Sequence, residues 1–156
     1  MVPDHAQVFL ALMCAIFSYL GVTILLDPDD ALKGHGLSFT GAEAAALAEV
    51  RAFYSGCFGT LAYVCGRCVP AGQTTERRRD ALNAVGCLLA LFSLARVYSY
   101  AVDGPPGRGN VYALWALEAL GATAALCLSL VESICSSAVD GVAAAGAVLL
   151  GGRKGE

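Results

Sequence analysis

Two residues of opposite charge lie inside apolar stretches in the second half of the chain. Arg96 lies six residues before Val102, and Glu118 lies seven residues after Val111. If these stretches are antiparallel membrane helices joined at residues 103–110, both charges lie about 9 to 10 Å below the same membrane surface. A lone charge at the centre of a bilayer costs about 2.5 to 3.5 kcal/mol on insertion scales. The spacing therefore predicts that Arg96 and Glu118 meet, as an ion pair or around a ligand.

More polar residues fall at the same end of the predicted spans. Arg96, Tyr100 and Asp103 have i, i+4, i+7 spacing and share one helix stripe. The predicted intramembrane polar layer consists of Glu49, Arg51, Arg96, Tyr100, Asp103 and Glu118. Two interpretations stay open. The layer either holds ion pairs that set the register of the helices, or binds a lipid headgroup, a quinone or a proton.

Cysteine supplies a second candidate for chemistry. Cys65 and Cys68 form a CxxC pair in which Arg67 would favour a thiolate, so a membrane thiol oxidoreductase that works with a quinone is one hypothesis. The alternative is coincidence in a chain with seven cysteines. No second CxxC and no nearby histidine complete a metal site. The chain also lacks a GxGxxG, a P-loop, an HExxH and a nucleophile elbow, so we expect no catalytic residue, metal or cofactor.

Composition indicates an integral membrane protein. Hydrophobic residues make up 57% of the 156 residues, charged residues make up 15%, and the mean hydropathy is +0.64. Bound lipids are therefore expected. A net charge of -3 and a single short basic cluster, Arg77 to Arg79, argue against nucleic acid as a partner.

The apolar stretches predict four membrane spans at about residues 6–26, 46–66, 81–102 and 111–132. Short connections make neighbouring spans antiparallel, so the expected fold is an all-α membrane protein with an antiparallel four-helix bundle over residues 1–132. Residues 133–156 form an apolar, small-residue tail. Its apolar stretch, 139–150, is too short to span a bilayer, so we expect it to lie at the interface or against a partner.

Loop charges predict the orientation. Arg67, Arg77 to Arg79, Arg153 and Lys154 fall on one side of the predicted topology, whereas the opposite loops carry only Lys33 and Arg108. By the positive-inside rule, both termini lie on the cytoplasmic, matrix or stromal side. Met1 followed by no transit signal favours the mitochondrial inner membrane or a bacterial plasma membrane over the plastid thylakoid.

Several motifs together resemble a known family. They are Leu26-Asp27-Pro28 at the end of the first span, Glu49 to Gly56 (EVRAFYSG) in the second, Arg96 followed by Val102-Asp103-Gly104-Pro105, and Glu118 in the fourth. This combination is similar to the small four-helix membrane proteins catalogued as domain of unknown function 4345. The family has Gly-Gly after the tyrosine, where this chain has Ser55-Gly56. The resemblance implies the fold and marks the polar layer as a family feature, but it implies no activity.

These observations lead to one principal hypothesis. A 16.0 kDa membrane chain with so little loop is expected to be a non-catalytic accessory subunit of a larger assembly, with lipids and other transmembrane subunits as partners. A mitochondrial respiratory or ATP-synthase type of complex is favoured, and a photosystem is a further option. The alternatives are a small-ligand, quinone or ion transport module built on the polar layer, and the thiol oxidoreductase.

Overall fold

The computed structural model describes residues 4–33, 48–70, 72–103 and 109–151, and these residues form helices without any strand. The elements are α1 (His5–Leu26), α2 (Pro28–Lys33), η1 (Arg51–Ser55), α4 (Gly56–Gly66), α5 (Thr75–Asp103) and α6 (Gly109–Gly151). Three helical stretches are long and apolar enough to cross a membrane: His5–Leu26, Thr75–Val102 and Trp115–Val139. The prediction of an all-α membrane protein is therefore confirmed.

Aspartates set both ends of the first apolar helix. The Asp4 side chain accepts the backbone N–H of Gln7, and the Gln7 side chain accepts the backbone N–H of Asp4, so a capping box starts α1. At the other end, Asp27 accepts the N–H of Asp30 at 3.0 Å and starts α2. The sequence predicts a loop after Asp27. The segment is helical because Pro28 suits a first helical position and Asp27 caps it.

The second predicted span is interrupted. Ala48 to Gly66 is helical, but its first part contains the π-helical turn η1, and α4 itself has only 11 residues. This segment therefore does not count among the three long helices. A π-turn holds one extra residue per turn and has no reliable signal in residue types. Residues 46 and 47, where the span was predicted to begin, lie outside the described residues.

The helix of the third predicted span starts earlier than expected. The sequence analysis began the span at residue 81, whereas α5 begins at Thr75, and the Thr74 hydroxyl accepts the N–H of Arg77 at 3.3 Å. This cap places Arg77 to Arg79 in the first turns of a helix and not in a loop. As a result, the side chains of these arginines can contact neighbouring helices.

The last helix extends beyond its predicted end. The sequence analysis placed a boundary between 132 and 133, but α6 continues without a break for 43 residues, to Gly151. The hydroxyls of Ser136 and Ser137 both donate to the carbonyl of Ser133 at 3.0 Å. These bonds satisfy the serines inside the helix, so the polar run does not end it.

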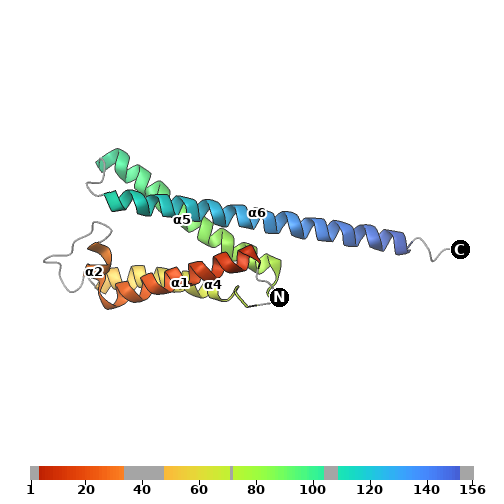
Figure 1. The fold of residues 1–156 in the computed structure, drawn as a ribbon, viewed down its shortest axis with the longest axis horizontal. Helices are drawn as coiled ribbons and strands as arrows, with labels where there is room; N and C mark the ends of the chain where they lie inside the picture. Colours follow the sequence, from red (N-terminus) through yellow and green to blue (C-terminus); the bar gives the residue numbers. More distant parts are fainter. Residues whose placement is uncertain (1–3, 34–47, 71, 104–108, 152–156) are drawn as a thin grey trace.

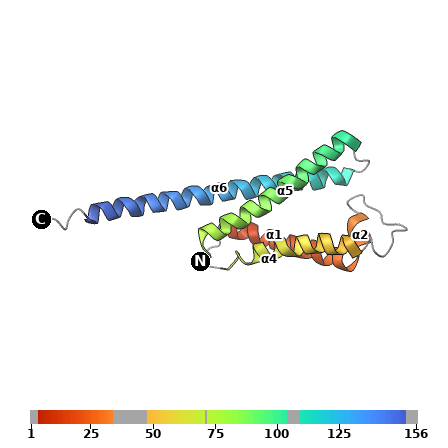
Figure 2. The same ribbon diagram turned by 180° about the vertical axis from the view of Figure 1, so that it is seen from behind.

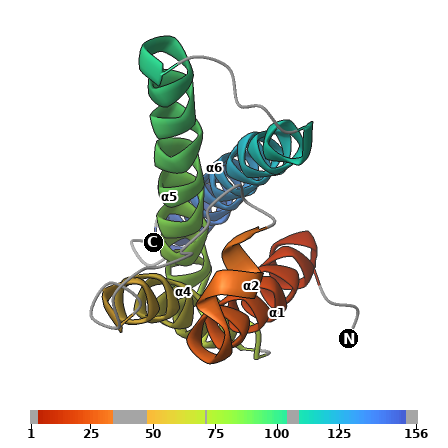
Figure 3. The same cartoon turned by 90° about the vertical axis from the view of Figure 1, so that its left-hand side faces the viewer.

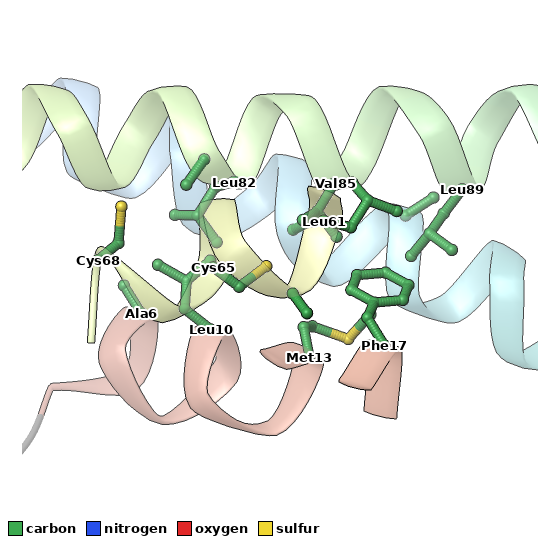
Figure 4. Packing of buried hydrophobic residues seen from close by; sticks show 14 residues of the cluster. Ala6, Leu10, Met13, Phe17, Leu61, Cys65, Cys68, Leu82, Val85 and Leu89 are labelled. Atoms are coloured by element: carbon green, nitrogen blue, oxygen red, sulfur yellow. The ribbon is translucent and has the colours of Figure 1, made fainter. Parts of the chain in front are cut away.

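The helices pack as two pairs. α1 lies along α4, where Phe17 stacks on Phe58 with ring centroids 5.9 Å apart, and α5 crosses α6 (Figures 1 and 2). Seen end-on, the α5·α6 pair lies on the α1·α4 pair (Figure 3). The buried core gathers where α5 begins, with Leu10, Cys65 and Leu82 among its fully buried side chains (Figure 4). α6 extends past the other helices towards the C-terminus (Figure 1).

Candidate functional site

Arg96 and Glu118 form a bidentate ion pair between α5 and α6. The Arg96 Nε donates to Glu118 Oε2 at 2.7 Å, and Nη2 donates to Oε1 at 2.8 Å. Both carboxylate oxygens are therefore engaged, in the fork geometry that makes arginine–carboxylate pairs strong. The side chains are 32% and 16% exposed. The prediction that these two residues meet is confirmed.

Among the described side chains of the predicted polar layer, no other charged residue forms an ion pair with Arg96 or Glu118. Glu49 is exposed at the start of the second helical segment, and Arg51 is half-buried in η1. Tyr100 is 47% exposed on α5, and the side chain of Asp103 is not among those that the structure describes. Among the described residues, no ion pair connects Glu49 or Arg51 with Arg96 or Glu118. The layer thus contains one closed pair and separate polar side chains.

The two CxxC cysteines are free and buried. Cys65 is 0% exposed and Cys68 is 2% exposed, and their sulfur atoms point in different directions (Figure 4). The Cys68 Sγ contacts the carbonyl of Arg77 at 3.6 Å. Burial raises the pKa of the Cys68 thiol, while the charges of Arg77, Arg67 and Arg78 oppose that shift. Such thiols behave as small hydrophobic core residues.

A seam of polar and small residues runs along the α5·α6 contact. The Ser129 hydroxyl of α6 donates to Asn83 Oδ1 of α5 at 2.6 Å. Two glycines allow close approach. A Cβ added at Gly86 would lie 2.8 Å from Leu126 Cγ, and one at Gly121 would lie 2.9 Å from a Leu89 methyl. Absence of a side chain at both positions therefore lets the helix backbones come near.

A second ionic cluster lies towards the start of α5, and the sequence analysis missed it. Arg78 Nη1 is 3.1 Å from Asp4 Oδ2, and Arg78 Nε is 3.4 Å from Glu132 Oε1. Arg78 thus connects α5 with the start of α1 and with α6. The order of the contacts along the two antiparallel helices could have revealed this cluster. Arg78, Asn83 and Arg96 of α5 contact Glu132, Ser129 and Glu118 of α6, respectively, so the contacts run in opposite directions along the two helices. Extending the Arg96–Glu118 register would have found the Arg78–Glu132 contact.

A pocket of about 520 Å³ adjoins this cluster. Its charged and polar wall includes Asp4, His5, Arg78 and Glu132, and its apolar wall includes Ala6, Leu128, Val131 and Val139. The volume is in the range of small-molecule sites, which combine an apolar lining with a few polar groups. Within the described ranges, no three histidine, cysteine or carboxylate side chains lie close enough together to hold a metal ion.

The chain belongs to the DUF4345 family, a domain of unknown function, whose family model matches residues 5–130. Comparison with curated proteins and comparison with solved structures give no match. The matched region contains both members of the Arg96–Glu118 pair. It begins after Asp4 and ends before Glu132, so both carboxylates of the Arg78 cluster and part of the pocket wall lie outside the region that the family model covers.

Proposed function

We propose that the protein is a non-catalytic accessory subunit of a larger membrane assembly. The observation that carries this proposal is the length of α6. Its 43 residues extend about 64 Å, roughly twice the thickness of the hydrocarbon core of a bilayer. A straight helix of this length that crosses the bilayer therefore extends beyond the bilayer surface.

The composition of this extension supports a protein partner. Residues 141–150 (GVAAAGAVLL) carry no charge. Val139 and Val142 are 67% and 74% exposed. An uncharged apolar helix outside the bilayer is stable in water only when its surface is covered. A hydrophobic helix or groove of a neighbouring subunit would provide that cover.

The closed ion pair agrees with a structural role for the polar layer. Both oxygens of Glu118 accept hydrogen bonds from Arg96, so a proton relay through Glu118 would weaken this ion pair. The pair compensates two charges that would each be costly alone in the bilayer. We infer that it holds α5 and α6 in register.

We further propose that α1, the η1–α4 segment, α5 and α6 form an antiparallel four-helix bundle with both termini on the positive side of the membrane. The arginines at the start of α5 support this orientation. The mitochondrial inner membrane remains our favoured location, with a bacterial plasma membrane or thylakoid as alternatives.

Shortening α6 tests the proposal. The natural assembly is extracted in mild detergent from cells that carry the full chain, a chain ending at residue 138, or a chain ending at residue 151. We expect deletion from Val139 onwards to lower the amount of co-purified partner strongly, because the covered helix is lost. The chain ending at residue 151 keeps α6 and is the matched control. Equal partner recovery with all three chains would refute the proposal.

A small-ligand or quinone module is a second candidate, and two hydroxyls favour it. Ser55 Oγ, at the end of η1, and Ser93 Oγ, one turn before Arg96 in α5, are buried without a hydrogen-bond partner. Buried polar groups of this kind are rare and call for an explanation such as a bound molecule. Extraction of the purified protein with organic solvent, followed by mass spectrometry, tests it. Recovery of a stoichiometric quinone would support this candidate, and its absence would remove it.

The thiol oxidoreductase is the candidate that the geometry supports least. A dithiol catalyst needs an accessible thiolate, but Cys65 and Cys68 are buried and the pKa of Cys68 is raised. We expect alkylation of Cys68 at neutral pH to be slower than alkylation of free cysteine. Rapid alkylation, together with loss of cellular function in a Cys65→Ser, Cys68→Ser variant, would restore this candidate.

A further inference from the structure

The pocket beside Arg78 is placed where a lipid headgroup lies. Its polar wall comes from Asp4 and His5 at the first turn of α1, Arg78 in the first turns of α5, and Glu132 near the end of the membrane-crossing part of α6. Asp4, His5 and Arg78 lie at the ends of apolar helices, and Glu132 follows the apolar run of α6 that ends at Val131. The apolar wall from Leu128 and Val131 continues towards the bilayer. A ligand with a polar head and apolar chains fits such a boundary.

The guanidinium of Arg78 has an unused donor. The Nε of Arg78 is buried and makes no hydrogen bond, although Glu132 Oε1 lies 3.4 Å away at ion-pair distance. A buried N–H without an acceptor is unfavourable, and guanidinium groups suit phosphate oxygens. The Arg78 side chain is itself only 15% exposed. Because Arg78 also lines the pocket, its guanidinium is the group there that suits an oxyanion.

The charges around Arg78 call for a cation as well. Among the described residues that line the pocket, two carboxylates, Asp4 and Glu132, face one guanidinium. A ligand that is only anionic would be repelled by the excess carboxylate, whereas a primary ammonium could donate hydrogen bonds to both carboxylates. The same cluster thus favours a ligand with a phosphate and an ammonium group close together.

We propose that this pocket binds the headgroup of phosphatidylethanolamine. Its phosphate accepts a hydrogen bond from Arg78, its ammonium donates to Glu132 and Asp4, and its acyl chains follow the apolar surface of α6. Choline carries no N–H donor, so phosphatidylcholine loses the bonds to the carboxylates. Phosphatidylglycerol has no cation and leaves the excess carboxylate without a partner.

The test measures how each lipid stabilises the purified full chain in detergent. Short-chain phosphatidylethanolamine, phosphatidylcholine and phosphatidylglycerol are titrated separately, and an apparent Kd is derived from the rise in unfolding temperature. We expect phosphatidylethanolamine to bind about tenfold tighter than phosphatidylcholine, as charge-assisted hydrogen bonds would produce. Equal binding of all three lipids, or tightest binding of phosphatidylglycerol, would overturn the proposal.

Two variants link the preference to the pocket. Glu132→Gln keeps the shape but removes a carboxylate, so the tenfold preference is expected to fall to about onefold. Glu76→Gln, the matched control, changes an exposed glutamate of α5 that does not line the pocket and is expected to keep the preference. If Glu132→Gln does not fold, Cys135→Trp fills the pocket and leaves its charged side chains in place. A preference retained in the folded pocket variant would contradict the proposal.

Discussion

The Arg96–Glu118 pair and the Arg78 cluster are both arginine–carboxylate ion pairs, and they lie towards opposite ends of α5. They differ in how many of the arginine's N–H groups make hydrogen bonds. Arg96 gives two hydrogen bonds to one carboxylate, which is itself fully engaged. Arg78 lies between two carboxylates, has an Nε that makes no hydrogen bond, and borders a pocket. A closed pair joins two helices and leaves its charges satisfied, whereas the open cluster is where we propose that a ligand binds.

The strongest test of this contrast removes half of the closed pair. Glu118→Leu leaves the Arg96 cation unpaired among apolar helices, so we expect the free energy of unfolding to fall by about 3 to 5 kcal/mol. The double variant Arg96→Met, Glu118→Leu removes both charges and is expected to recover most of that loss. Denaturant unfolding in detergent measures both values. A double variant as unstable as the single one would show that the pair does more than cancel its charges.

Removing the centre of the open cluster is expected to have a smaller effect. Arg78→Met separates α5 from Asp4 and Glu132, whose side chains are 46% and 13% exposed. Water can partly solvate Asp4, so we expect a loss of about 2 kcal/mol, between the values for exposed and buried pairs. The same unfolding measurement applies. A loss equal to that of Glu118→Leu would mean that the two clusters are equally closed.

The seam between the two clusters can be tested through its glycines. Gly86→Ala places a methyl group against Leu126 and is expected to cost about 1 to 2 kcal/mol, because overpacking outweighs the gain in helix propensity. Gly59→Ala is the matched control, since a Cβ there has nothing within 4 Å. That control is expected to be neutral or slightly stabilising. Equal effects at the two sites would argue against close packing of α5 on α6.

The smallest effect is expected from the polar contact in the same seam. Ser129→Ala removes the hydrogen bond to Asn83, and interhelical bonds of this kind contribute about 0.6 kcal/mol in membranes. Asn83 is exposed and can find another partner, which limits the loss. Unfolding at several temperatures resolves so small a difference. If Ser129→Ala lowered the free energy of unfolding more than Gly86→Ala does, the hydrogen bond and not the packing would be the main source of stability in this seam.

The sequence predicted the features that stand out against an apolar background. Arg96 and Glu118 were predictable because each is a lone charge in an apolar helix, and their distances from the turn match. Arg78 was missed because it lies among consecutive arginines in a polar segment, where capping by Thr74 decides between loop and helix. η1 and the continuation of α6 past Ser133 depend on local hydrogen bonding, which residue types leave open. Helix existence was thus easier to predict than helix ends.

The central claim is that the exposed apolar surface of α6 is covered by another subunit. The most direct measurement is gentle detergent extraction of the native protein, followed by size separation and mass spectrometry of the proteins that co-migrate with it. The account predicts migration within a large membrane assembly with defined partner proteins. Migration as a small free species with no protein partner would contradict it.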